Sequence, residues 1–149
     1  MYDTILVPLD GSKRAETIIK HITKLAQTLN SKLILLTVVE PSYFKGSEEM
    51  VIAESFTAPE KETKKAETYL AKLQKKLVKN DIQVETKVIT GSPVTMIKEI
   101  AEQENADLVT IASHGHGGLT RVFYGSVAAA VMNQVDRPLL IVRSRNVKE

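Results

Sequence analysis

The residues most suited to chemistry lie in a glycine-rich segment at positions 112–126, which reads Ala-Ser-His-Gly-His-Gly-Gly-Leu-Thr-Arg-Val-Phe-Tyr-Gly-Ser. The apolar run 108–112 predicts a buried strand, and the small-residue run 126–132 predicts a helix packed closely on a sheet. Glycines after a strand allow a sharp turn and leave backbone N–H groups open to close approach. A helix beginning at Ser126 would add free N–H groups and the positive end of its dipole. The pattern fits a phosphate cradle, and it fits equally well a plain connection that ends in a serine cap.

A second polar segment, Pro8-Leu-Asp-Gly-Ser12, follows the apolar run 5–7 near the start of the chain. Open α/β sheets bind ligands outside the carboxyl ends of their strands, at the point where the strand order reverses. If the strands before the two segments are neighbours, both segments face one crevice. Asp10 is then a candidate ligand contact. Its alternative role is a cap for the following helix, although Ser12 can supply that cap.

Strand-like and helix-like stretches alternate along the whole chain. We expect strands at 4–8, 33–39, 84–89, 108–112 and 139–142, and helices at 15–29, 59–77, 93–101 and 126–132. The continuous apolar runs indicate strands buried on both faces, whereas the alternation at 84–89 predicts a partly exposed edge strand. Five strands alternating with four helices predict an open, doubly wound, Rossmann-like parallel sheet of the α/β class.

The segment at residues 40–58 shows no clear pattern, and Pro59 is expected in the first turn of the charged helix that follows it. A loop of this length is uncommon in a compact domain and is often functional. Two interpretations stay open. The segment is either a mobile flap over a bound ligand or a partly helical stretch at 48–55 that packs on a dimer partner or on the sheet edge.

Composition limits the function further. The 149 residues predict one domain, 1–149, with 43% hydrophobic and 26% charged residues. A net charge of +2 does not favour nucleic acid as a partner. The absence of cysteine excludes disulfides, thiolate metal sites and cysteine nucleophiles. No basic leader and no membrane-length apolar run is seen, so we expect a cytoplasmic protein that does not contact a membrane.

The chain resembles the universal stress protein family over nearly its whole length. Matching stretches are Ile5-Leu-Val-Pro-Leu-Asp-Gly-Ser12 and the apolar run 35–39. Most specific is the pattern G-x2-G-x9-G-[S/T] of the members that bind ATP. Here it begins with Ala112 in place of glycine and continues with Gly115, Gly125 and Ser126. The resemblance implies strand order 3-2-1-4-5 and places the chain in the ATP-binding subclass.

The resemblance also implies a set of site residues, with ATP as the cofactor and Mg2+ or Mn2+ held through its phosphates. Asp10 would contact the nucleoside and Val38 would offer an apolar edge to adenine. The implied ATP-binding set is Pro8, Asp10, Val38, Ala112, Gly115, Gly125, Ser126 and Val127. His116 and Arg121 are candidate phosphate contacts, and His116 stands where many relatives carry a basic residue. No catalytic residue and no direct metal ligand is assigned.

The expected function is therefore that of an ATP-binding, cytoplasmic regulatory or protective factor in the stress response. A dedicated enzyme is not expected, because the chain has no G-x4-G-K-[S/T] motif and no G-x-S-x-G motif. Two alternatives stay open. One is a member that has lost nucleotide binding and acts through protein contacts, and the other is a slow ATPase or nucleotidyl transferase.

The last strand predicts an oligomer. Its residues Leu139, Leu140, Ile141 and Val142 are all apolar, yet the implied strand order places them at a sheet edge. An exposed apolar edge invites pairing with another strand. The resemblance implies a homodimer in which two copies of this strand run antiparallel.

Overall fold

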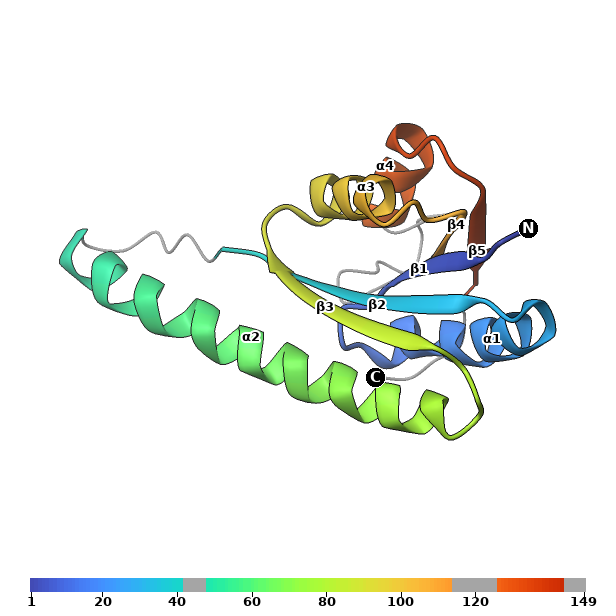
Figure 1. The fold of residues 1–149 in the computed structure, drawn as a ribbon. Coiled ribbons are helices and arrows are strands. Elements are labelled where there is room, and N and C mark those ends of the chain that lie inside the picture. The colour runs from blue at the N-terminus through green and yellow to red at the C-terminus, as the bar shows by residue number, and fades with distance from the viewer. Residues whose placement is uncertain (42–47, 114–125, 144–149) are drawn as a thin grey trace.

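The computed structural model describes residues 1–41, 48–113 and 126–143, with the backbone alone for 48–59. These residues form five strands and four helices in strict alternation (Figure 1). In chain order they are β1 Thr4–Pro8, α1 Lys13–Leu29, β2 Lys32–Val39, α2 Glu48–Val78, β3 Val84–Thr90, α3 Pro93–Gln103, β4 Leu108–Ala112, α4 Ser126–Gln134 and β5 Leu139–Val142.

The strands form one parallel sheet in the order β3-β2-β1-β4-β5, which confirms the predicted fold class and strand order. Val7 of β1 lies opposite Leu35 of β2, and Ile5 lies opposite Leu108 of β4. The chain adds β2 and β3 on one side of β1 and then returns to add β4 and β5 on the other. The strand order therefore reverses between β1 and β4.

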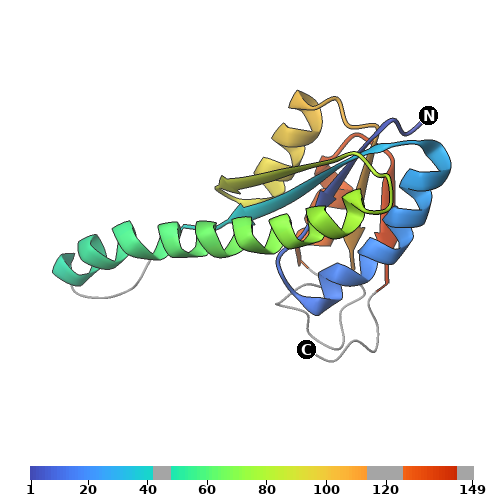
Figure 2. The ribbon, with the colours of Figure 1, turned by 60° about the horizontal axis from the view of Figure 1, so that its bottom comes forward.

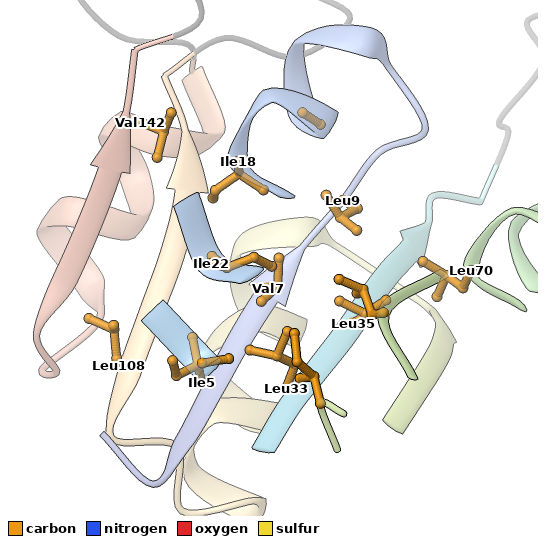
Figure 3. Packing of buried hydrophobic residues seen from close by; sticks show 14 residues of the cluster. Ile5, Val7, Leu9, Ile18, Ile22, Leu33, Leu35, Leu70, Leu108 and Val142 are labelled. Atoms are coloured by element: carbon orange, nitrogen blue, oxygen red, sulfur yellow. The ribbon is translucent and has the colours of Figure 1, made fainter. Parts of the chain in front are cut away.

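Helices cover both faces of the sheet, with α1 and α2 on one face and α3 and α4 on the other (Figure 1). Because successive strand residues point to opposite faces, Ile5 and Val7 pack toward α1 and α2, whereas Leu6 packs toward α3 and α4. Figure 3 shows the first of these layers, where Ile22 of α1 lies beside Val7 of β1. Residues 5–7 are wholly inaccessible to solvent, as expected for a central parallel strand.

The predicted edge strand is confirmed at β3, where residues 84–89 are half-buried and Thr90 is exposed. Its charged residues form a linked set of ion pairs on the α3 side of the sheet. Glu85 accepts from Lys32 of β2 at 2.6 Å and from Lys87 at 3.1 Å, and Lys87 also contacts Glu104 at the end of α3 at 2.8 Å. Charges of this kind on an edge strand disfavour pairing with another sheet.

The start of α2 differs from the prediction. The helix begins at Glu48 and continues through Pro59, so the expected beginning at Pro59 is wrong, and residues 48–58 are not a loop. The alternative of a helical stretch at 48–55 agrees with the structure, while residues 42–47 lie outside the described part. A proline inside a helix removes one backbone hydrogen bond and costs about 3 kcal/mol, but strong helix formers such as Glu48, Glu49 and Ala53 favour continuation.

The long α2 reaches past the body of the protein. Figures 1 and 2 both show its first turns extending beyond the ends of the strands, while its later turns lie under β2 and β3. Leu70 and Leu77 hold those later turns on the sheet, since both are buried in the layer shared with α1. Despite the length of α2, no helix in the described part of the chain is apolar over enough residues to cross a membrane.

Replacing Glu85 with glutamine should lower the free energy of unfolding near neutral pH by at most about 1 kcal/mol, because water screens these partly exposed pairs. Hydrogen bonds first from Lys32 and then from Lys87 hold the pKa of Glu85 below its ordinary value. The carboxylate therefore stabilises the fold above its unfolded-state pKa, and this contribution is lost as the pH falls through the lower pKa of the folded state. Urea unfolding of both proteins across this pH range should show the difference shrinking in acid. A difference that does not change with pH would contradict the assignment.

Candidate functional site

A cavity of about 770 Å3 opens at the carboxyl ends of the strands, next to the point where the strand order reverses. β1, β2 and β4 contribute their last residues to it, and all four helices contribute side chains to its wall. The position is the one that open α/β sheets use for ligands. Its volume lies within the range of small-molecule sites, which is about 300–1,000 Å3.

The turn from β1 into α1 is held by a chain of local hydrogen bonds. The Asp10 carboxylate accepts the N–H of Ser12 at 3.0 Å, and the Ser12 hydroxyl accepts the N–H of Ala15 at 3.0 Å. Gly11, between Asp10 and Ser12, has a φ of 82°, a left-handed conformation that glycine adopts without steric cost. Ser12 therefore caps α1, and the alternative role of Asp10 as the helix cap is not realised. Asp10 stays exposed at the cavity wall with its backbone position defined.

β2 forms the apolar part of the wall. Leu36 is fully buried, and Val38 is half-buried and lines the cavity. The Thr37 hydroxyl donates to the carbonyl of Leu9 at 2.9 Å, and the N–H of Leu9 donates to the carbonyl of Leu36 at 2.8 Å. These two bonds join the ends of β1 and β2, so the backbone that carries Val38 is fixed relative to the backbone that leads into Asp10.

The opposite wall comes from β4 and the start of α4. β4 ends at Ala112, and the N–H of the next residue, Ser113, donates to the carbonyl of Val142 at 2.9 Å. Ser126 is the first residue of α4 and is exposed at the cavity, with half-buried Val127 beside it. The first N–H groups of a helix have no partner within the helix, and the helix dipole places partial positive charge there. This wall is suited to an anion.

The structure brings together the six predicted ATP-binding residues that it describes, all of which line this one cavity. They are Pro8, Asp10, Val38, Ala112, Ser126 and Val127. Gly115, His116, Arg121 and Gly125 lie outside the described residues. That these six residues contact ATP stays a prediction. In the described part of the chain, no group of three or more His, Asp or Glu residues is placed to hold a metal ion directly.

The sequence reasoning missed the wall that α2 supplies. Glu62, Lys65, Ala66 and Tyr69 line the cavity at the three- and four-residue spacing of one helix face. In the sequence, Ala66, Leu70 and Leu77 recur at helical spacing within the expected helix 59–77, so the neighbours of Ala66 on that face could have been listed. Nothing local in the sequence indicates that this face reaches the carboxyl end of β1. Pro93 and Ile97 of α3 also line the cavity and were likewise missed.

Tyr69 of α2 lines the cavity and has a buried hydroxyl. Burial raises the pKa of its phenol well above the ordinary value, and the nearby carboxylates of Glu16 and Asp10 raise it further. The hydroxyl thus stays protonated at physiological pH. Within the described residues no group meets hydrogen-bond geometry with this buried hydroxyl, although Glu16 is close enough to act on its charge.

Comparison with known proteins gives consistent similarities. A family model described as the universal stress protein family matches residues 1–143. Universal stress protein MJ0577 of Methanocaldococcus jannaschii is 28% identical, with 98% of each chain covered. The solved MJ0577 structure has a TM-score of 0.86 at 29% identity, with 99% of each chain covered.

Two further solved structures share the fold. UspA of Lactobacillus plantarum has a TM-score of 0.86 at 23% identity and covers 95% of this chain and 98% of its own. A universal stress protein solved in complex with cAMP has a TM-score of 0.67 at 24% identity, with 96% and 98% covered. The similarities extend over nearly the whole chain rather than over one motif.

The Ser12→Ala variant should lose about 1 kcal/mol of folding free energy, because the N–H of Ala15 loses its capping acceptor. Ser92 offers a matched control, since it is the N-cap residue of α3 but makes no side-chain capping bond. The Ser92→Ala variant should therefore change the free energy of unfolding much less. Chemical denaturation of the two variants compares them directly. If the Ser12→Ala variant loses no more free energy of unfolding than the Ser92→Ala variant, the capping bond of the Ser12 hydroxyl does not stabilise the turn that carries Asp10.

Proposed function

Because the chain belongs to the universal stress protein family, we propose that it binds ATP in the cavity between β1 and β4 and acts as a cytoplasmic regulatory or protective factor in the stress response. One observation carries the proposal. An exposed carboxylate, an apolar strand end and a helix N-terminus line the same cavity at the point where the strand order reverses. A nucleoside phosphate has a polar sugar, an apolar base and an anionic end. The carboxylate suits the sugar, the apolar strand end suits the base, and the helix N-terminus suits the phosphates.

In the proposed arrangement the base lies against Val38 and the sugar lies near Asp10. A carboxylate accepts hydrogen bonds from sugar hydroxyls, and a half-buried valine gains from covering an aromatic ring. The phosphates would lie at the start of α4, where Ser126 and Val127 present backbone N–H groups. Gly115 and Gly125 complete the cradle in the predicted site, with His116 and Arg121 as candidate phosphate contacts.

One further observation supports a nucleotide as the ligand. A universal stress protein with this fold has been solved in complex with cAMP, so the fold accommodates an adenine nucleotide in that protein. The family match over residues 1–143 also supports treating 1–149 as one domain. Mg2+ or Mn2+ would be held through the phosphate oxygens of ATP, since both cations prefer oxygen donors.

We propose binding rather than dedicated catalysis as the primary role. Phosphoryl transfer needs groups positioned to orient the nucleophile and to neutralise the developing charge. The cavity residues assigned here bind and orient a nucleotide, and none is assigned as a base or nucleophile. Incubation with ATP and magnesium followed by product analysis tests the alternative of a slow ATPase or nucleotidyl transferase.

Mass spectrometry of the nucleotide that co-purifies, followed by calorimetric titration with ATP, tests the proposal. The Asp10→Asn variant should weaken ATP binding about tenfold, because hydrogen bonds to a charged group contribute more than those to a neutral amide. Its fold should persist, since an asparagine oxygen can still accept the N–H of Ser12.

Asp107 supplies the matched control for this variant. Its carboxylate accepts the N–H of Thr4 at 2.9 Å, at the opposite end of the sheet from the cavity. The Asp107→Asn variant removes the same charge from the protein and should bind ATP as the wild type does. Absence of ATP binding by the wild-type protein would reject the proposed function and favour a member that acts through protein contacts.

We also propose that the protein forms a homodimer through β5. β5 lies at the sheet edge, and its residues Leu139, Leu140 and Ile141 are only half-buried within one chain. The carbonyls of Pro138 and Val142 accept bonds from β4. Backbone groups alternate in direction along a strand, so those of Leu139 and Ile141 point toward the open edge. An antiparallel partner strand would pair with them.

The Ile141→Lys variant should be monomeric in light scattering at a concentration where the wild type is dimeric, because a charged edge opposes strand pairing. Ile141 also packs partly against the core, so the variant could lose structure as well. An Ile141→Pro variant introduces no charge but removes the N–H that faces the open edge, so it should also be monomeric. Circular dichroism verifies that both variants are folded. Folded variants that remain dimeric would place the interface elsewhere.

A further inference from the structure

The described cavity wall carries more negatively than positively charged residues. Asp10, Glu40 and Glu62 contribute three carboxylates, whereas Lys65 of α2 is the one positively charged residue among the described residues of the wall. Glu62 and Lys65 lie three positions apart on the same face of α2. The described wall is therefore acidic apart from one lysine, although its proposed ligand is an anion.

Lys65 is free to act on a ligand. Its side chain is exposed, and among the described residues it has no ion-pair or hydrogen-bond partner. A lysine ammonium is a compact charge on a flexible four-carbon stem, so it can turn from solvent into the cavity opening. Charges act more strongly on one another across a cleft with low-dielectric walls than in open water.

We propose that Lys65 sets the preference of the cavity for phosphorylated over unphosphorylated nucleosides. It offsets the repulsion between the wall carboxylates and the phosphates, while Glu62 on the same helix face acts in the opposite sense. A neutral nucleoside feels neither effect. This inference rests on the proposed function, and it assigns charge selectivity to α2, outside the loops that carry the glycine pattern.

Titration of wild-type and variant proteins with ATP and with adenosine in one magnesium buffer tests the proposal. The Lys65→Gln variant should bind ATP about fivefold more weakly, the scale of a partly exposed ion pair. Its affinity for adenosine should stay within about twofold of the wild type, because the lost charge has no charged partner there. The Glu62→Gln variant should change ATP affinity in the opposite direction.

Lys64 supplies the matched control, since it is the exposed neighbour of Lys65 on α2 and does not line the cavity. The Lys64→Gln variant changes the net charge of the protein equally and should leave the ratio of ATP to adenosine affinity unchanged. Raising the salt concentration should reduce that ratio in the wild type and have less effect in the Lys65→Gln variant.

The outcomes separate the two proposals. A wild type that binds ATP and adenosine, combined with an unchanged affinity ratio in Lys65→Gln, overturns the role of Lys65 and leaves the proposed function intact. Equal effects from the Lys64 and Lys65 variants overturn it as well, because they indicate overall charge alone. A wild type that binds neither compound rejects the proposed function and this inference together.

Discussion

Burial of β1 on both faces is the constraint on which the rest of the structure depends. Residues 5–7 are inaccessible to solvent, so helices must cover the sheet above and below this strand. A buried strand also needs a neighbour on each side to pair its backbone N–H and C=O groups, and the chain supplies β2 on one side and β4 on the other. The crossovers diverge at the carboxyl end of β1, and the cavity lies at that divergence. The site is thus a consequence of the way the chain covers its central strand.

The polar groups around the cavity are positioned by bonds that also stabilise the fold. The Asp10 carboxylate orders the turn into α1, and the Ser12 hydroxyl caps that helix. Thr37 joins the ends of β1 and β2 through the carbonyl of Leu9. A ligand therefore meets groups that are already placed, which reduces the entropy cost of binding. Because the Ser12 cap both stabilises α1 and orders the turn that carries Asp10, a change at Ser12 affects stability and site geometry together.

α2 contributes two of the charged residues in the described cavity wall, Glu62 and Lys65. The helix is anchored by Leu70 and Leu77 in the core, and this packing turns Glu62, Lys65 and Tyr69 toward the cavity. The Tyr69 phenol is neutral at physiological pH, and burial together with the nearby carboxylates of Glu16 and Asp10 raises its pKa further, so it adds no negative charge to the wall. On α2 itself, the charge facing the cavity then comes from two exposed residues of opposite sign, Glu62 and Lys65.

The sequence by itself determined the alternation of strands and helices, the central strand β1 and the edge strand β3, the turn that carries Asp10, and the beginning of α4 at Ser126. These features follow from local signals, because apolar runs, helix periodicity and turn residues act within a few positions of one another. The beginning of α2 was predicted wrongly, since Pro59 is a strong local signal that the helix formers before it outweigh. Only the tertiary structure decided that Glu62, Lys65 and Tyr69 line the cavity. Which face of α2 reaches the end of β1 is set by how Leu70 and Leu77 pack on the sheet, and such contacts between distant segments leave no local pattern in the sequence.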